Sequence, residues 1–136
     1  LLPTARQETA LRAVIGGAPL VGSGAGKRLP YAPKTALTLR VGQHFNARWD
    51  ASLEGVYVGE QFGDFANRTD TDASGQFGVI EAYAIANATV NYTPDSAWSG
   101  FFTVKNMLDR RYVIDRTRGI QIAPPRQLQL GLRLEY

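Results

Sequence analysis

The chain has 136 residues, of which 44% are hydrophobic and 20% charged, and this composition favours one folded domain over a disordered segment. Its net charge of +3 is too small to indicate a nucleic-acid partner, and the absence of cysteine excludes disulfides and thiolate metal sites. No stretch approaches the roughly 18 apolar residues of a transmembrane helix, and the Leu1-Leu2-Pro3 start lacks the basic and apolar regions of a signal peptide.

Apolar and polar residues alternate along the chain with a period of two, which predicts β-strands whose successive side chains point to opposite faces. A first strand is expected to end near Thr4–Gln7. Five further strands of about ten residues each are predicted in chain order: Thr35–Phe45, Trp49–Phe62, Ile80–Tyr92, Trp98–Met107 and Leu128–Tyr136.

The alternation assigns each strand an apolar and a polar face. The apolar face is predicted to carry Leu37, Leu39, Leu53, Val90, Phe102, Val104, Leu130 and Leu132. The polar face is predicted to carry Arg40, Glu54, Asn91, Lys105, Gln129 and Arg133. His44, the only histidine, falls on the polar face too, where a solvated side chain is expected.

The connections alternate in length. Asn46–Arg48 and Thr93–Ala97 are short turns, whereas Glu8–Pro33, Gly63–Val79 and Leu108–Pro125 are long and rich in Gly, Pro, Asp and Arg. In an antiparallel meander the short turns lie at one end and the long loops at the other, which is the arrangement of outer-membrane barrels.

Aromatic residues mark the strand ends at the short turns. These residues are Phe45, Trp49, Tyr92, Trp98 and Tyr136. Trp and Tyr favour a membrane interface because the ring is apolar and its tip is polar. The pattern favours a membrane barrel, and a soluble β-sandwich or small β-barrel that binds a ligand or a protein remains the alternative.

Three segments carry motifs of a known kind. One is Val104-Lys105-Asn106-Met107-Leu108-Asp109-Arg110-Arg111-Tyr112, which resembles the Asn-Leu-Phe-Asp-Lys-x-Tyr segment that precedes the last extracellular loop of TonB-dependent receptors, proteins of the bacterial outer membrane. The segment 26–34 is similar to a loop-to-strand junction of the family, and Pro125-Arg126 opens a final strand that ends in an aromatic residue. Residues 62–67 and 115–121 further resemble the ferric-citrate branch.

The resemblance implies an all-β fold in which residues 1–136 form the C-terminal five to six strands of a 22-stranded transmembrane barrel, without its plug domain. It implies a receptor that takes up a ferric siderophore or ferric citrate and performs no chemistry on it. The implied partners are the iron chelate, outer-membrane lipid and lipopolysaccharide, and an inner-membrane energy-transducing complex that acts through the plug. No cofactor is implied.

Ligand contacts are expected in the last long loop, which carries Arg110, Arg111, Arg116 and Arg118. The planar guanidinium fork suits carboxylate and phosphate groups. Arg116 and Arg118 are the candidates for an anionic iron chelate, with Asn67 of the preceding loop as a third. Contact with lipopolysaccharide phosphates or simple solvation remains the alternative. Tyr136 is the candidate assembly signal of the barrel.

Two motifs point weakly to other chemistry. Asp70, Asp72, Ser74 and Glu81 fit the spacing of a calcium loop, but the flanks are strands rather than helices. The segment 22–28 lacks the first glycine and the Ser or Thr of a phosphate loop. One histidine and no recognisable carboxylate pair also argue against an enzyme, including an outer-membrane enzyme barrel.

Overall fold

The computed structural model describes residues 5–9, 22, 24–94 and 97–135, and none of these is helical. Within this part of the chain no helix is long and apolar enough to cross a membrane. The chain divides into two compact units, which we call the sheet unit and the loop unit. The sheet unit comprises residues 37–57, 84–111 and 124–136, and the loop unit comprises residues 1–36, 58–83 and 112–123.

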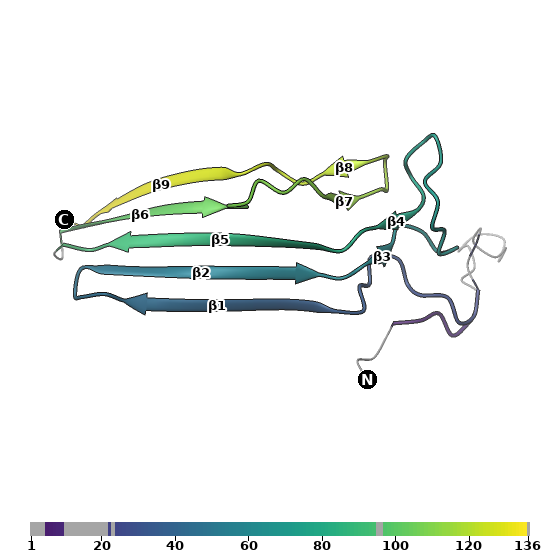
Figure 1. Ribbon diagram of the computed structural model, residues 1–136, viewed down its shortest axis with the longest axis horizontal. Helices are drawn as coiled ribbons and strands as arrows, with labels where there is room; N and C mark the ends of the chain where they lie inside the picture. The colour runs from purple at the N-terminus through teal and green to yellow at the C-terminus, as the bar shows by residue number, and fades with distance from the viewer. Residues whose placement is uncertain (1–4, 10–21, 23, 95–96, 136) are drawn as a thin grey trace. The chain divides into compact units, whose positions relative to one another are not determined.

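Five long strands form one sheet in the order β1-β2-β5-β6-β9 (Figure 1). Their bounds are Ala36–His44 (β1), Trp49–Val58 (β2), Tyr83–Tyr92 (β5), Trp98–Lys105 (β6) and Gln127–Leu134 (β9). Each long strand lies beside the next long strand along the chain, and β5, β6 and β9 pair antiparallel. The predicted antiparallel meander is therefore confirmed.

Both short turns lie at the same end of the sheet. In the first turn, the side-chain oxygen of Asn46 accepts hydrogen bonds from the backbone N–H groups of Arg48 (2.8 Å) and Trp49 (3.1 Å). This is the local bonding that makes Asn favourable in turns. The N–H of Thr93, after β5, donates to the carbonyl of Arg48 (2.8 Å) and joins the second turn to the first.

One face of the sheet is apolar and exposed. Cα partners in neighbouring strands share a face, and Val90, Phe102 and Leu130 are such partners across β5, β6 and β9. Leu130 is 77% exposed, and the leucines of β1 and β2 on this face are also more than half exposed. Val104 alone of the eight predicted residues is half-buried. Such a contiguous apolar surface is abnormal for a protein surrounded by water.

Three aromatic rings cluster at the short-turn end of this apolar face. The ring of Tyr92 lies 4.3 Å from that of Trp49 and 5.5 Å, edge-on, from that of Trp98. Phe45 is exposed beside the same turn. Tyr136, the fifth predicted member, lies outside the described residues. The cluster is the arrangement expected where a sheet crosses a membrane interface.

The loop unit contains two small antiparallel sheets. One pairs β3 (Gln61–Phe62) with β4 (Val79–Ile80), and the other pairs β7 (Val113–Asp115) with β8 (Gln121–Ile122). The buried hydrophobic residues of the described chain, Ile80 and Ala123, both belong to this unit. The β7–β8 hairpin lies inside the segment predicted as the loop Leu108–Pro125.

Two predicted strands are shorter than expected. The strand predicted as Trp49–Phe62 ends at Val58, and the N–H of the next residue, Gly59, still donates to the carbonyl of Thr35 (2.8 Å) beside β1. A Cβ at Gly59 would lie only 3.0 Å from that oxygen, so any larger residue would crowd the Thr35 backbone. The strand predicted as Ile80–Tyr92 is likewise interrupted between β4 and β5.

The segment predicted to end a sixth strand forms a short antiparallel contact instead. Arg6 bridges Arg28, and the N–H of Gln7 donates to the carbonyl of Lys27 (2.7 Å). Thr4 lies outside the described residues. This contact belongs to the loop unit rather than to the five-stranded sheet.

Candidate functional site

The turn at Asp115 is built around one carboxylate. Its Oδ1 accepts hydrogen bonds from the N–H of Thr117 (2.8 Å), the hydroxyl of Thr117 (2.5 Å) and the hydroxyl of Tyr31 (2.8 Å). The bonds from Thr117, with that from Tyr31, lower the pKa of Asp115 from 3.8 to about 2, because they favour the charged form. Asp115 is thus ionised at neutral pH and holds the turn together.

Arg116 is buried, although it was predicted as a ligand contact. Its Nε donates to the carbonyl of Val79 (3.1 Å) and its Nη1 to the carbonyl of Gly75 (3.2 Å). The Arg116 side chain packs against Gly63, where a Cβ would lie 3.3 Å from it and would crowd it. The guanidinium therefore satisfies backbone carbonyls of the preceding loop segment.

Arg118 is exposed in the same turn. The N–H of Gly119 donates to the carbonyl of Arg116 (3.2 Å), and Gly119 has a φ of 101°, which favours glycine. Within the described part of the chain, the guanidinium of Arg118 makes neither a hydrogen bond nor an ion pair. Its five N–H donors face solvent, where a carboxylate or phosphate could be bound.

Asn67 joins two segments of the loop unit. Its side-chain oxygen accepts from the N–H of Arg28 (2.7 Å), and its amide donates to the carbonyls of Arg28 (2.8 Å) and Asp64 (3.3 Å). Asn67 has a φ of 56°, a conformation that Asn tolerates better than most residues. These contacts give Asn67 a structural role, and its role as a ligand contact stays a prediction.

Arg28 is a second buried arginine, and the sequence offered no sign of its role. Its Nη2 donates to the carbonyls of Glu60 (2.9 Å) and Ala32 (3.2 Å), and its guanidinium lies 5.1 Å from the centre of the Phe62 ring. Its Nη1 lies 3.9 Å from the Glu60 carboxylate. A buried, multiply bonded arginine ties together chain segments that are distant in the sequence.

The calcium-loop residues are not gathered around one point. The Asp72 carboxylate accepts two contacts from the Ser74 hydroxyl (2.7 and 2.9 Å), and Asp70 and Glu81 are exposed. Among the described residues, no three His, Cys, Asp or Glu side chains gather in a group that could hold a metal ion. The spacing in the sequence is thus not matched by convergence in space.

The Asn106 motif organises the end of β6. The buried Asn106 accepts a hydrogen bond from the N–H of Arg110 (2.9 Å) and donates to the carbonyls of Arg110 (2.9 Å) and Pro124 (3.3 Å). The Asp109 carboxylate accepts from the N–H of Arg126 (2.8 Å), just before β9. The motif therefore fixes where the chain leaves β6 and where it returns to β9.

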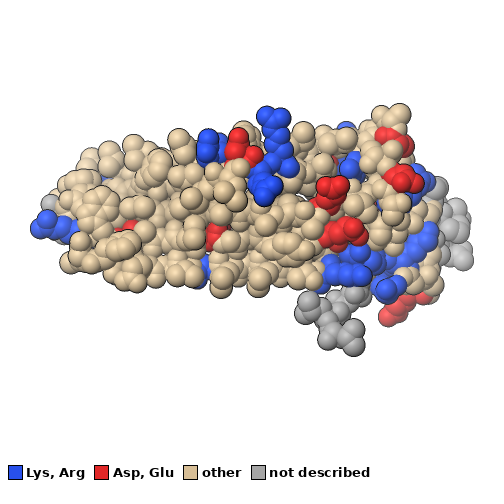
Figure 2. All heavy atoms as spheres, viewed as in Figure 1, with Lys and Arg blue, Asp and Glu red and all other residues tan. Residues whose placement is uncertain are grey.

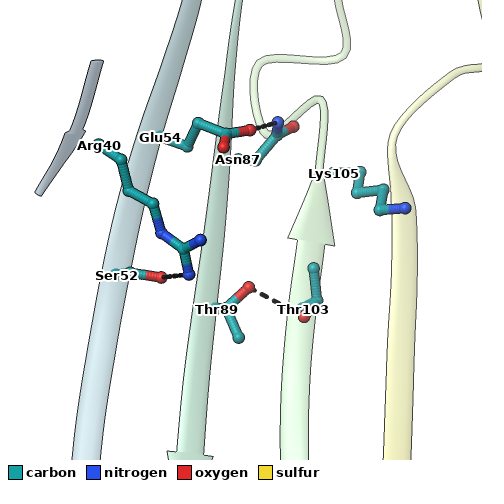
Figure 3. A pocket seen from close by; sticks show the side chains of 7 residues that line it. All are labelled: Arg40, Ser52, Glu54, Asn87, Thr89, Thr103 and Lys105. Atoms are coloured by element: carbon teal, nitrogen blue, oxygen red, sulfur yellow. Dashed lines mark hydrogen bonds between the residues drawn. The ribbon is translucent and has the colours of Figure 1, made fainter. Parts of the chain in front are cut away.

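The polar face of the sheet carries a shallow hollow of about 130 Å³ (Figure 3). Hydrogen bonds cross it from strand to strand, from Arg40 to Ser52 (3.2 Å), from Asn87 to Glu54 (2.8 Å) and between Thr89 and Thr103 (3.0 Å). Lys105 completes the lining. Near the turns the amide of Asn91 donates to Asp50 (2.8 Å) on the same face. The predicted polar face is confirmed for Arg40, Glu54, Asn91 and Lys105.

On the face shown in Figure 2, charged side chains are sparse over the long strands of the sheet. A sheet with one uncharged apolar face and one hydrogen-bonded polar face suits a wall between lipid and a watery lumen.

The comparisons with known proteins agree with this geometry. The family described as "TonB dependent receptor-like, beta-barrel" matches residues 11–107. No curated protein sequence matches the chain. Among solved structures, the ferric citrate transporter FecA in its unliganded form is 31% identical with a TM-score of 0.70, and the match covers 80% of this chain and 17% of FecA.

Two other solved receptors share the fold at lower identity. The ferric-catecholate import receptor Fiu of E. coli, in its closed form, is 22% identical with a TM-score of 0.67, covering 92% of this chain and 17% of Fiu. The siderophore receptor PiuA of Acinetobacter baumannii is 18% identical with a TM-score of 0.74, covering 96% of this chain and 18% of PiuA. The chain thus spans less than a fifth of the length of each solved relative.

Proposed function

Because this chain belongs to the TonB-dependent receptor family, whose barrels lie in the bacterial outer membrane, we propose that it forms wall strands and loops of a receptor that takes up a ferric chelate. The single observation that carries this proposal is the two-faced sheet, since Leu130 and its neighbours are exposed while Arg40 and Glu54 line the opposite face. In the intact receptor the apolar face contacts lipid and the polar face lines the lumen.

An anionic ferric chelate, ferric citrate or a siderophore, is the proposed substrate. The similarity to a ferric citrate transporter supports ferric citrate. Arg118 is the proposed ligand contact, because its guanidinium is exposed and carboxylate groups are its preferred partners. Arg116 and Asn67 have a structural role in this proposal, because their hydrogen bonds to backbone carbonyls hold the loop unit together. The iron chelate is cargo, and the receptor carries out no reaction on it.

The proposed partners follow from the same assignment. Outer-membrane lipid and lipopolysaccharide surround the apolar face, and an inner-membrane energy-transducing complex drives release of the chelate through a plug domain. In that assembly residues 1–136 are the C-terminal segment of the barrel. Tyr136, the terminal aromatic residue, serves as its assembly signal.

The alternative, a soluble β-sandwich, requires that the leucines of the sheet pack into a closed core. Leu37, Leu39, Leu53 and Leu132 are instead more than half exposed. Their exposure counts against a soluble sandwich.

The test of the proposed substrate is binding of radiolabelled ferric citrate to the intact receptor in outer membranes. Arg118→Ala removes a charge-assisted hydrogen bond worth about 1.5–3 kcal/mol, which corresponds to about a ten- to 150-fold loss of affinity. The matched control is Arg111→Ala, because Arg111 is an exposed arginine of the sheet unit. This variant should bind ferric citrate like the wild type. Unchanged affinity in Arg118→Ala would reduce this arginine to a solvated surface residue.

A further inference from the structure

The tyrosine hydroxyl at the centre of the loop unit has partners on both sides of Arg116. Tyr31 comes from a segment 84 residues away, yet its hydroxyl donates to the Asp115 carboxylate (2.8 Å) and accepts from the N–H of Arg116 (3.1 Å). The same oxygen lies 3.3 Å from the hydroxyl of Thr117. Three consecutive residues immediately before Arg118 are therefore held by one side chain.

The backbone of Tyr31 is itself in an unusual conformation. Its φ is 55°, in the left-handed region, which is unfavourable for a residue with a Cβ. The N–H of Tyr31 donates to the carbonyl of Phe62 (2.9 Å), so β3 fixes the place from which the ring extends. The surrounding structure holds a strained residue where its hydroxyl meets the turn.

The remaining contacts of the turn 115–117 with other segments are made by its buried residue, Arg116. Arg116 is bonded to the carbonyls of Val79 and Gly75, and the Cβ position of Gly75 is closed off by Ile120. Among the described residues outside this segment, only Tyr31 is hydrogen-bonded to Asp115, to Thr117 and to the backbone N–H of Arg116. Without its hydroxyl, the outer side of the turn would lose its link to the first segment of the loop unit.

We infer that Tyr31 is a positioning residue, whose hydroxyl holds the turn 115–117 so that Arg118 is presented in one orientation to a carboxylate group of the chelate. This inference rests on the proposed function, in which Arg118 contacts the ligand. A preordered arginine binds more tightly than a mobile one, because the entropy of ordering the turn is lost on folding rather than on binding.

The first arm of the test needs no ligand. These 136 residues contain no cysteine, so a nitroxide spin label attached at Arg118→Cys reports the mobility of the turn in an intact receptor in which any cysteine outside them is replaced by serine. Tyr31→Phe, which removes only the hydroxyl, should increase the mobility of the label. Tyr83→Phe is the matched control, because Tyr83 lies in the same unit and stacks its ring on Tyr112. A label that is equally mobile in Tyr31→Phe and in the wild type would overturn the inference.

The second arm is a double-mutant cycle with ferric citrate as the probe. Tyr31→Phe alone should weaken binding about three- to tenfold, and the same change in an Arg118→Ala background should have no further effect. Equal losses in both backgrounds would show that Tyr31 does not act through Arg118. No loss in Arg118→Ala with a mobile label in Tyr31→Phe would remove Arg118 from the proposed ligand contacts, and would leave standing only the role of Tyr31 in holding the turn.

A second variant guards against a receptor that fails to assemble. Thr117→Val keeps the shape of the side chain and removes the hydroxyl that contacts Asp115 and Tyr31. It should also mobilise the label and couple to Arg118 in the binding cycle. All variants are compared at equal amounts of heat-resistant barrel in the outer membrane. An immobile label in Thr117→Val would contradict the role of this hydroxyl cluster.

Discussion

Replacing Leu130 by arginine tests which face of the sheet meets lipid. Leu130 is the fourth residue of β9 and 77% exposed, and its Cα partner is Phe102 on the apolar face. A strand rises about 3.3 Å per residue, so Leu130 lies within about 2 Å of the midpoint of β9. The charge of Leu130→Arg would therefore be close to the middle of the lipid-facing band.

An arginine at the bilayer midplane destabilises a membrane barrel by about 2–4 kcal/mol. This corresponds to about a 30- to 1,000-fold smaller folding equilibrium constant. Gln129→Arg is a matched control one residue away, because Gln129 pairs with Thr103 on the polar face. A charge there points into the lumen and should change the free energy of folding by no more than about 0.5 kcal/mol.

The assay is unfolding by urea of the receptor refolded in phospholipid vesicles, followed by the shift of the folded barrel in unheated gels. Leu130→Arg should lower the midpoint of unfolding clearly, whereas Gln129→Arg should leave it unchanged. Equal destabilisation by both variants, or a larger effect of Gln129→Arg, would refute the assignment of the two faces.

Three further outcomes are expected. Replacing Tyr136 by alanine should lower the amount of assembled barrel, measured in outer-membrane fractions, without changing the chelate affinity of what does assemble. Gly131→Ala should cost about 1–3 kcal/mol in the urea assay, because its Cβ would lie 2.2 Å from the ring of Phe101, and adding Phe101→Leu should restore most of the loss. Since the folded pKa of Asp115 is about 2, below its ordinary 3.8, the stabilisation by this carboxylate is complete above about pH 4 and is lost as the pH falls toward 2. A carboxyl ¹³C titration with a midpoint near 3.8 would contradict the hydrogen-bonded turn.

The amino-acid sequence by itself determined the two faces of the strands and the short turns of the sheet. Strand side chains alternate by local backbone geometry, so Leu128, Leu130, Leu132 and Leu134 had to share a face whatever the rest of the chain did. The short turns followed from local preference too, since Asn46 bonds N–H groups only two and three residues away. For the same reason the pairing of β1 with β2 and of β5 with β6, which these short turns join, needed no long-range information.

The tertiary structure alone decided the loop unit and the candidate site. The sequence ranked Arg116 with Arg118, because both are arginines of a long loop, but burial separates them: Arg116 bonds to Val79 and Gly75, whereas Arg118 faces solvent. The link from Tyr31 to Asp115 joins residues 84 positions apart. Such contacts depend on which segments meet in space, and no periodicity along the chain encodes that meeting, because loop residues lack the repeating geometry of a strand.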